Sequence, residues 1–248
     1  MQLWKAKETV VEIGKRLWQR GYVAANDGNI SVKIDSDRLL TTPTGESLGF
    51  MQPDDLVLCD LKGQVLQGER QPSSELLMHL EVYRLRPEVE AVVHAHPPVA
   101  TAFSVAGIEL SGCVLPESVV VLGAVPIAPY ATPWTAEVPE GLRPIIPKCD
   151  AVLLQNHGAV TWAEGLEAAY FKMETLEMTA TVTHYARGLG QVNTLGVAQV
   201  DKLMNLREEK QVPGKLVPCV TDPNCGSEEL VERVVQRVLE KIQDKSRS

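Results

Sequence analysis

The sequence predicts an α/β protein in which helices flank a mixed or largely antiparallel sheet. Helical and strand-like segments are interleaved along the 248 residues, yet several consecutive strands have no helix between them. A doubly wound parallel sheet needs a helical crossover between successive strands, so this order of elements favours antiparallel pairing. With 44% hydrophobic residues, a chain of this length can bury a sizeable core.

The first predicted helix follows from the spacing of its apolar residues. Leu3, Val10, Ile13 and Leu17 recur at helical intervals, and Gly21 follows as a stop signal. Short strand-like runs come next, separated by Asp, Gly and Pro, at residues 29–34, 38–42, 56–61 and 64–67. We expect these runs to form strands with no helix between them.

The middle of the chain contains helices and buried strands in turn. Pro72 opens a predicted helix that runs to about residue 85, and Pro97 precedes a shorter helix that ends near residue 106. Further strands are predicted at residues 91–96, 126–130, 151–155 and 158–162, and a long helix at residues 163–187. We interpret residues 1–190 as one domain.

The composition changes beyond Gly190. Residues 192–224 contain one short helical piece and then a loop with proline and glycine, and residues 227–243 predict a final amphipathic helix. Acidic residues begin this last helix and basic residues follow, as the helix dipole favours. We therefore expect residues 191–248 to be a helical extension of the same domain.

The overall charge limits the classes of partner. The chain has a net charge of −8 and no basic runs, which argues against nucleic acid and anionic membrane surfaces. The first twenty residues mix charged and apolar positions, unlike a signal peptide, and no stretch approaches the length of about 18 apolar residues that a membrane span needs. We expect a cytoplasmic protein with no nucleic-acid or membrane partner.

The five cysteines are scattered, odd in number and without Cys-x-x-Cys spacing. They are Cys59, Cys113, Cys149, Cys219 and Cys225. This pattern favours reduced thiols over a disulfide framework or a cysteine zinc site.

Three histidines predict a metal site. His94 and His96 end an apolar strand, and residues i and i+2 of a strand point to the same face. His157 lies at the tip of a later strand-turn-strand, and three histidines with a free fourth position are the ligands of a catalytic zinc ion. The alternative is a hydrogen-bonded histidine pair at a sheet edge beside an ordinary turn. His79 and His184 fall in predicted helices, where we expect packing or hydrogen bonds behind the site.

Three turns could bind an anion such as phosphate. Ser73, Ser74 and Glu75 lie at a predicted helix N-terminus, where unpaired N–H groups and the helix dipole favour negative charge. Ordinary helix capping is the alternative interpretation. The segments 27–29 and 42–45 also offer backbone N–H groups and short polar side chains, or they are simply turns.

Six segments in this order resemble the class II aldolase family, typified by the L-fuculose-1-phosphate aldolases. They read Ala-Asn-Asp-Gly-Asn-Ile-Ser at 25–31, Thr-Pro-Thr-Gly at 42–45, Pro-Ser-Ser-Glu at 72–75, Val-Val-His-Ala-His at 92–96, Ala-Pro-Tyr-Ala-Thr at 128–132 and Leu-Gln-Asn-His-Gly at 154–158. The similarity covers roughly residues 3–190. Six ordered motifs are far more specific than any one of them.

The resemblance implies a three-layer α/β/α fold with a mostly antiparallel central sheet, and residues 1–190 as the catalytic domain. It also implies a homotetramer with active sites between subunits. Zinc, or Mn²⁺ or Co²⁺ in its place, would be bound by His94, His96 and His157. Glu75 would ligate or shield the metal and move protons. The phosphate of the substrate would be held by Gly28, Asn29, Thr44, Gly45, Ser73 and Ser74.

The activity implied is the reversible cleavage of a ketose 1-phosphate to dihydroxyacetone phosphate and a small aldehyde. Fuculose 1-phosphate or a deoxy-pentulose or deoxy-hexulose 1-phosphate would be the substrate. One departure concerns the aldehyde-side proton donor, for which the family uses tyrosines. Residues 113–118 contain no tyrosine, and Tyr185 is the last one in the chain. This donor is therefore unidentified.

Other members of the superfamily give alternative functions. Sugar-phosphate 4-epimerases carry Asp where this chain has Glu75, and sugar-acid phosphate decarboxylases and methylthioribulose-phosphate dehydratases use the same scaffold. Adducin head domains resemble the fold but have lost the metal ligands. Because all three histidines and Glu75 are present here, an enzyme is favoured over such a non-catalytic module.

Overall fold

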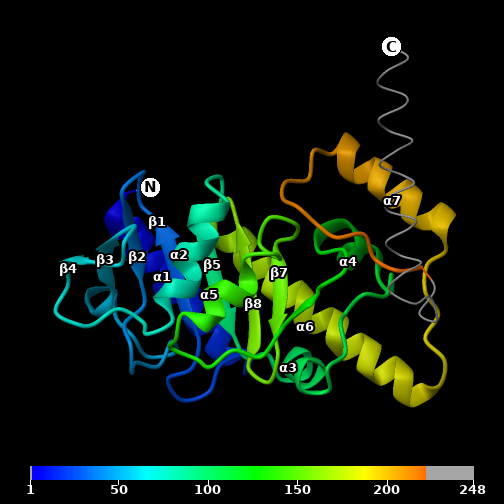
Figure 1. Ribbon diagram of the computed structural model, residues 1–248, viewed down its shortest axis with the longest axis horizontal. Helices are drawn as coiled ribbons and strands as arrows, with labels where there is room; N and C mark the ends of the chain where they lie inside the picture. Colours follow the sequence, from blue (N-terminus) through cyan, green and yellow to red (C-terminus); the bar gives the residue numbers. More distant parts are fainter. Residues whose placement is uncertain (1, 222–248) are drawn as a thin grey trace, which may run out of the picture.

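Eight strands form one sheet at the centre of residues 2–221, the part of the chain that the computed structural model describes (Figure 1). They are β1 (Asn29–Lys33), β2 (Arg38–Thr41), β3 (Val57–Asp60), β4 (Val65–Gln67), β5 (Ala91–Ala95), β6 (Ile127–Ala128), β7 (Ala151–Leu154) and β8 (Gly158–Ala163). Their order across the sheet is β4-β3-β2-β1-β5-β8-β7-β6. Every neighbouring pair is antiparallel except β6 and β7, which run parallel.

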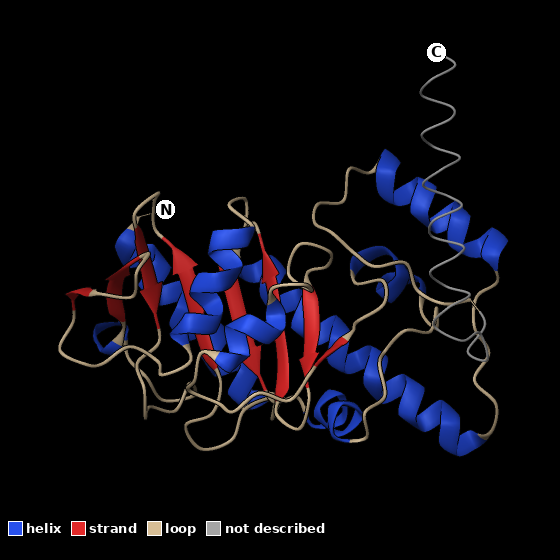
Figure 2. Ribbon diagram, in the orientation of Figure 1, coloured by secondary structure: helices blue, strands red, loops and turns tan. Residues whose placement is uncertain are grey.

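Helices cover both faces of this sheet. Within the described residues they are α1 (Leu3–Gln19), a short 3-10 helix η1 (Pro53–Asp55), α2 (Leu76–Leu85), α3 (Pro98–Val105), α4 (Pro116–Val121), α5 (Glu137–Leu142), α6 (Leu166–Leu189) and α7 (Val197–Glu209). Helices α1, α3 and α6 pack on one face and α2 and α5 on the other (Figure 2). The predicted three-layer α/β/α fold with a mostly antiparallel central sheet is confirmed.

The strands divide their apolar side chains between two cores, because successive residues of a strand point to opposite faces. In β5, Ala91 and Val93 join the core formed with α1, α3 and α6, whereas Val92 joins the core under α2 and α5. Trp162 of β8 is fully buried in this second core. His94 follows Val92 by two residues, so its side chain faces the layer of α2 and α5.

Helix α2 begins at Leu76, later than the predicted start at Pro72. The reason is a backbone pairing that the sequence does not show. The Ser73 N–H donates a hydrogen bond of 3.0 Å to the Thr42 carbonyl, so this segment is extended and not helical. As a result, Glu75 directly precedes the first residue of the helix. Neither α4 nor α5 is predicted from the sequence, because six residues are too few to show a helical period.

Helix α7 confirms the short helical piece predicted beyond residue 190. It packs against α4 through Val119 and Val200, and the Arg207 guanidinium on α7 donates hydrogen bonds to the Val120 and Gly214 carbonyls. The helix predicted at residues 227–243 lies outside the described residues. The assignment of residues 191–248 as an extension of the catalytic domain stays a prediction.

Asp150 ties the segment after α7 to the sheet. Its buried carboxylate accepts hydrogen bonds from Arg86 at 2.9 Å, from Lys172 at 2.6 Å and from the Lys215 backbone N–H at 3.0 Å. Gly214 passes directly over this carboxylate with a φ of +94°, and an added Cβ would lie 2.0 Å from a carboxylate oxygen. Only glycine fits at this approach.

A disulfide bond joins Cys113 to Cys219, so the expectation that all thiols are reduced is wrong for this pair. The two residues are 106 positions apart in sequence, but backbone pairing brings them together. The Cys113 N–H donates to the Val220 carbonyl at 3.1 Å, and the Val220 N–H donates to the Ser111 carbonyl at 2.7 Å. Cys59 and Cys149 are buried free thiols. Cys225 lies outside the described residues.

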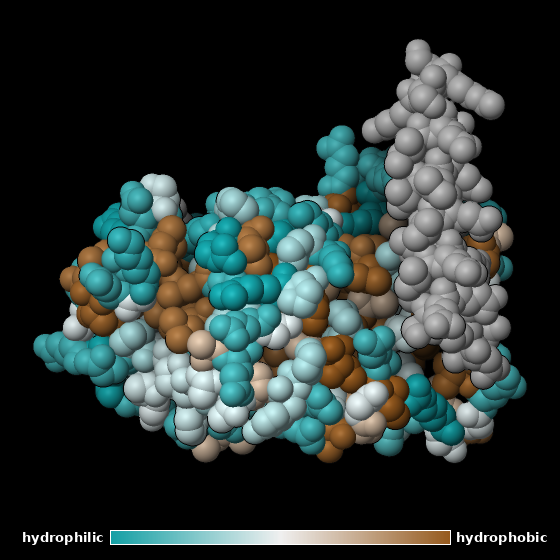
Figure 3. Space-filling model, in the orientation of Figure 1, coloured by the Kyte–Doolittle hydropathy of each residue, from teal (hydrophilic) through white to brown (hydrophobic). Residues whose placement is uncertain are grey.

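None of the helices within residues 2–221 combines the length with the apolar character that a membrane span needs. On the face shown in Figure 3, apolar side chains form several separate patches among hydrophilic ones.

Candidate metal centre

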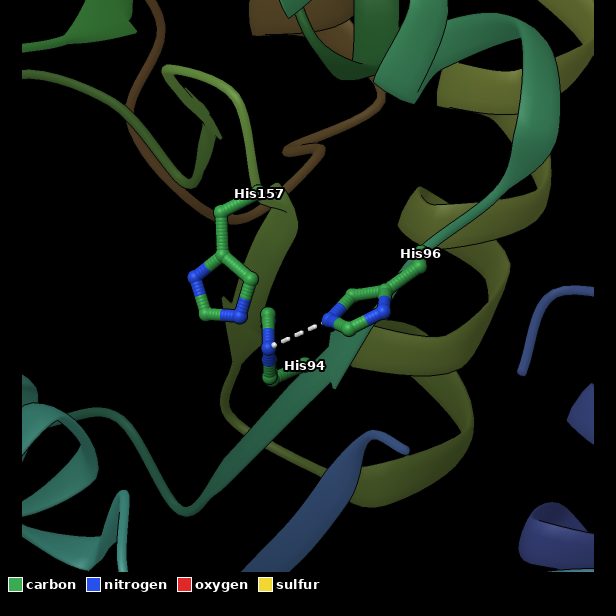
Figure 4. A group of neighbouring side chains, drawn as sticks. All are labelled: His94, His96 and His157. Atoms are coloured by element: carbon green, nitrogen blue, oxygen red, sulfur yellow. Dashed lines mark hydrogen bonds between the residues drawn. The ribbon is translucent and has the colours of Figure 1, made fainter. Parts of the chain in front are cut away.

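Three histidine side chains converge at one end of the sheet (Figure 4). His94 and His96 come from the end of β5, and His157 comes from the turn between β7 and β8. One ligand nitrogen from each ring lies within 4.8 Å of the others. The structure therefore brings together the three residues that the sequence predicts as metal ligands.

The end of β5 fixes the orientation of the first two rings. The His94 ring is fully buried, and its Nδ1 lies 3.0 Å from the Ala159 carbonyl. A proton on Nδ1 makes this hydrogen bond, so Nε2 is the nitrogen that is directed at the other histidines. The backbone N–H of His96 donates to the Tyr22 carbonyl at 2.8 Å. The ring Nδ1 of His96 lies 3.5 Å from Asp27 Oδ2. Both rings thus have a partner on the side away from the centre.

The turn that carries His157 needs the residues on both sides of it. Asn156 has a φ of +57°, a left-handed conformation that asparagine adopts more readily than most residues. Gly158 packs against β5, where an added Cβ would lie 2.5 Å from the Ala95 carbonyl oxygen and 2.5 Å from the His96 ring. The Asn-His-Gly sequence is therefore required by the turn as well as by the site.

Glu75 completes the centre from the start of α2. Its Oε2 lies 3.3 Å from His94 Nε2, and its Oε1 lies 3.4 Å from His157 Nε2. The Asn29 side-chain amide donates a hydrogen bond of 2.8 Å to Oε2. The carboxylate thus faces the ring nitrogens from one side and is held in that position by Asn29.

The protonation states follow from burial and charge. Burial, helped by positive charge on His94, lowers the pKa of His157 to about 4. Burial and the other two histidines lower the pKa of His96 to about 3, so both rings are neutral near pH 7. Burial works against charge on His94 and Glu75 as well, but each stabilises the other. The pKa of His94 is therefore raised and that of Glu75 lies well below its ordinary value.

The donor atoms fit a divalent metal. Two nitrogen ligands at 2.0–2.1 Å from a tetrahedral zinc ion are about 3.3 Å apart. The His94 and His96 Nε2 atoms are 3.2 Å apart, and the two contacts of Glu75 with the histidines are of similar length. Imidazole nitrogens, which bind a metal in the deprotonated form, and a carboxylate are ligands that suit zinc and related divalent metals. The negative charge of Glu75 and the low pKa values of His96 and His157 also favour a positive ion between these groups.

The three turns that the sequence predicts to bind phosphate lie side by side. The Thr42 N–H donates to the Ile30 carbonyl at 3.0 Å, and the Ile30 N–H donates to the Thr42 hydroxyl at 3.1 Å. The Thr44 N–H donates to the Gln71 carbonyl at 3.0 Å, next to the pairing of Ser73 with Thr42. We call the six predicted phosphate ligands in these turns the three-turn cluster: Gly28, Asn29, Thr44, Gly45, Ser73 and Ser74.

Members of the three-turn cluster differ in exposure and contacts. Three are exposed to solvent: Thr44, Gly45 and Ser74. Asn29 and Ser73 are buried, and both bond to Glu75, since the Glu75 N–H donates to the Ser73 hydroxyl at 3.3 Å. This bond is a local serine-to-backbone turn before the helix, and Glu75, the N-cap residue of α2, makes no side-chain capping bond. Phosphate binding by the cluster stays a prediction.

Gly28 has a steric role in the same region. Its φ is +75°, and an added Cβ would lie 2.6 Å from the Val23 side chain and 2.9 Å from the His94 carbonyl oxygen. The chain at Gly28 therefore packs against β5, the strand that carries His94. A side chain here would separate the cluster from β5.

A buried network behind the centre could not be recognised from the sequence. The Ser31 hydroxyl lies 2.7 Å from His79 Nδ1 and 2.7 Å from the Tyr83 hydroxyl. Burial lowers the pKa of His79 to about 3, so this ring is neutral and packs as expected. The spacing of His79 and Tyr83 on one helix face is the only signal that the sequence offers. His184, by contrast, is exposed on α6 with its ring against Tyr185, so the expectation of packing or hydrogen bonds behind the site is wrong for this residue.

A small pocket lies beside Glu75. It is lined by Ser74 and Leu77 of the α2 segment and by Trp134 and Val138 from the loop and helix that follow β6, among others. Trp134 has a φ of +67° and is 73% exposed. A conformation that is costly for a bulky residue holds this indole at the edge of the candidate site.

The fold and the three-histidine centre define the class of protein. Residues 8–184 match the family described as the class II aldolase and adducin N-terminal domain. This match covers most of the chain, so the chain belongs to the class II aldolase family. It is an enzyme of a superfamily that uses a divalent metal, as the resemblance of its motifs implies.

Individual relatives carry more than one activity. L-fuculose phosphate aldolase of Methanococcus vannielii is 38% identical over 176 residues, which cover 70% of this chain and 93% of that protein. The 3-oxo-tetronate 4-phosphate decarboxylase of Pectobacterium atrosepticum is 37% identical over 180 residues, covering 71% and 82%.

Solved structures agree with this assignment. YgbL from Escherichia coli superimposes with a TM-score of 0.76 at 33% identity, over 81% of this chain and 98% of that one. An L-fuculose 1-phosphate aldolase gives a TM-score of 0.75 at 29% identity, over 82% and 95%.

Proposed function

We propose that this protein is a zinc-dependent aldolase that reversibly cleaves a ketose 1-phosphate into dihydroxyacetone phosphate and a small aldehyde. Fuculose 1-phosphate or a deoxy-pentulose or deoxy-hexulose 1-phosphate is the substrate. The observation that carries this proposal is the convergence of three histidines and Glu75 beside the three-turn cluster. Its support from relatives is the similarity to L-fuculose phosphate aldolases.

In this proposal, separate groups of residues bind the metal, bind the phosphate and transfer the proton. A divalent metal held by His94, His96 and His157 supplies a Lewis acid for the oxygens beside the bond that breaks. The three-turn cluster holds the phosphate end of the substrate. Glu75 relays a proton: its carboxylate, whose oxygens lie 3.3–3.4 Å from the histidine nitrogens, takes a proton from a substrate hydroxyl or from water and delivers it to the three-carbon fragment after cleavage.

A decarboxylase acting on a phosphorylated 3-oxo sugar acid is the second candidate. One relative at 37% identity carries such an activity in its name, and a chemical observation also favours it. Retro-aldol cleavage must remove a proton from the hydroxyl at the aldehyde end, whereas loss of CO₂ from a carboxylate needs no such base. Residues 113–118 contain no tyrosine that could do this. Epimerase and dehydratase activities have no comparable support.

The proposed assembly is a homotetramer with active sites between subunits, and its support is the family membership. Size-exclusion chromatography with light scattering measures the number of subunits directly.

A cytoplasmic location is expected of an enzyme of sugar-phosphate metabolism. The disulfide between Cys113 and Cys219 counts against this location, because disulfides are rare in reducing compartments.

A product assay separates the two candidate activities. The purified protein, loaded with Zn²⁺, is given ketose 1-phosphates or 3-oxo sugar-acid phosphates, and dihydroxyacetone phosphate is measured by coupling to its NADH-dependent reduction. An aldolase releases an aldehyde with this product and makes the ketose phosphate again from both. A decarboxylase releases CO₂. Absence of dihydroxyacetone phosphate from the ketose 1-phosphate panel, together with absence of CO₂ from the 3-oxo acid panel, would contradict both candidates.

A further inference from the structure

Side-chain hydrogen bonds join strand β1 to helix α2 at two adjacent levels. At the first level, the Asn29 amide nitrogen donates to Glu75 Oε2 at 2.8 Å. At the second level, the Ser31 hydroxyl lies 2.7 Å from His79 Nδ1. The two strand residues are two positions apart and the two helix residues four positions apart, which is about 7 Å along a strand and about 6 Å along a helix. The two levels are therefore direct neighbours.

Each level leaves one buried polar atom without a hydrogen-bond partner among the described residues. At the first level this atom is Asn29 Oδ1, and at the second level it is His79 Nε2. Asn29 is only 4% exposed and His79 only 1%. Unpaired buried polar atoms are unfavourable, so two of them at neighbouring levels indicate a partner that both share.

The Asn29 amide cannot pair its oxygen by turning over. In the reversed orientation the oxygen would face the Glu75 carboxylate, and two acceptors would repel each other. In the observed orientation one N–H of the amide serves Glu75 and the second N–H is available to an anion in the three-turn cluster. The oxygen is an acceptor and cannot serve an anion. Its donor must therefore come from the protein interior.

The hydrogen bonds behind Ser31 place a proton on His79 Nε2. Burial raises the pKa of Tyr83, and hydrogen bonds with Ser31 and with the Val92 backbone oppose this rise. A backbone group that lowers the pKa of a phenol is a donating N–H, so the Tyr83 hydroxyl directs its own proton to Ser31 at 2.7 Å. The Ser31 proton is then directed to His79 Nδ1. A neutral imidazole that accepts at Nδ1 carries its proton on Nε2.

A single water molecule satisfies both unpaired atoms. Asn29 Oδ1 needs a donor and the Nε2–H of His79 needs an acceptor, and the two are not bonded to each other. Water does both, and buried waters in proteins commonly join polar groups that are otherwise unpaired. Two hydrogen bonds of about 2.8 Å bridge atoms up to about 5.6 Å apart, which is close to the separation of the two levels.

We propose that a buried water joins His79 Nε2 to Asn29 Oδ1, and that His79 is thereby a positioning residue for Asn29 and Glu75. The ring fixes the Asn29 amide with its nitrogen toward Glu75. This bond holds the carboxylate beside the ring nitrogens of His94 and His157. The water bridge rests on these contacts alone, whereas its effect on turnover rests on the proposed function.

A crystal structure of the full-length wild type loaded with Zn²⁺, at a resolution that shows ordered water, tests the bridge directly. One water should lie within about 3.2 Å of both Asn29 Oδ1 and His79 Nε2. A structure in which these two atoms share no water would overturn the proposal. This measurement needs no substrate, so its outcome is independent of the proposed function.

Two substitutions of His79 separate positioning from packing. Glutamine places its amide nitrogen near the position of Nε2 and can still donate to the water, whereas asparagine reaches only to the position of Nδ1. The visible absorption of bound Co²⁺ changes with its surroundings, so His79→Asn should alter the cobalt spectrum of the substrate-free protein as Glu75 loses its fixed position. His79→Gln should keep the wild-type spectrum.

Turnover should follow the same pattern as the cobalt spectrum. With unchanged metal content, kcat of His79→Asn should fall about tenfold, as expected for the loss of one hydrogen bond, and His79→Gln should recover most of it. His184→Asn makes the same change at an exposed ring on α6 and is the matched control. It should leave both the spectrum and kcat unchanged.

The possible failures are distinguishable. If His79 only packs, both of its variants should lose stability in urea while the cobalt spectrum and kcat stay those of the wild type, and this result would overturn the positioning role. If the wild type turns over no candidate substrate, the proposed function fails, and the crystal structure and cobalt spectra still decide the inference. If neither His79 variant folds, the wild-type crystal structure decides it alone.

Discussion

Replacing Glu75 with glutamine removes the candidate base and keeps the shape of its side chain. The carboxylate oxygens lie 3.3 Å from His94 Nε2 and 3.4 Å from His157 Nε2, so the amide of the variant would stand in the same place. A positioned general base contributes roughly 10²–10⁴-fold, and kcat should fall by that factor. Metal should stay bound because the three histidines remain.

Folding should survive this change. Glu75 makes no side-chain capping bond to α2, so helix content should be that of the wild type by circular dichroism. The assay measures initial rates of dihydroxyacetone phosphate formation and the metal content of the same preparation. A kcat near that of the wild type, with metal bound, would refute the assignment of Glu75 as the proton carrier.

The same variant has a pH signature in the metal-free protein. The pKa of Glu75 is lower than its ordinary value, so its contribution to stability is present above its unfolded pKa and is lost as pH falls. The pKa of His94 is raised, so its contribution is present below its unfolded pKa and is lost as pH rises. The pair should stabilise the fold most between about pH 4.3 and 6.5, the unfolded values. Urea unfolding of wild type and Glu75→Gln should differ most there, and a pH-independent difference would contradict this.

Three other substitutions test separate parts of the structure. Ser74→Ala should raise KM for a phosphorylated substrate with little change in melting temperature, and a lower melting temperature with unchanged KM would make Ser74 a helix cap. Gly158→Ala forces a Cβ to 2.5 Å from the Ala95 oxygen. It should cost about 1–3 kcal/mol in urea unfolding and weaken metal binding, whereas wild-type values of both would disprove the packing. Cys219→Ser should lower the unfolding free energy by about 2–4 kcal/mol. Dithiothreitol should do the same to the wild type alone, and equal sensitivity of the variant would count against the disulfide.

Much of the site follows from local patterns in the sequence. His94 and His96 are two residues apart in an apolar strand, so the sequence alone places both rings on one face. The Asn-His-Gly turn is also local, since Asn156 and Gly158 meet backbone requirements that the sequence makes visible. The order of the six motifs then identifies the family, and membership of the family implies the fold and the expected metal ligands.

What the sequence does not show depends on contacts between distant segments. The pairing of residue 42 with residue 73 delays the start of α2, and no local signal marks it. The disulfide between Cys113 and Cys219 depends on strand-like pairing across 106 positions, which cysteine spacing does not reveal. The bond from Asn29 to Glu75 joins residues 46 positions apart. Such contacts are set by the way the chain folds, and no local sequence pattern predicts them.

The metal content of wild type and His157→Ala tests the central claim most directly. Both proteins are expressed, stripped with a chelator and reloaded with Zn²⁺, and bound metal is measured by mass spectrometry of the metal after removal of the excess. The wild type should retain about one zinc ion per chain, and the variant should retain almost none while its circular dichroism stays unchanged. Stoichiometric zinc in folded His157→Ala would show that the three histidines are not the metal site.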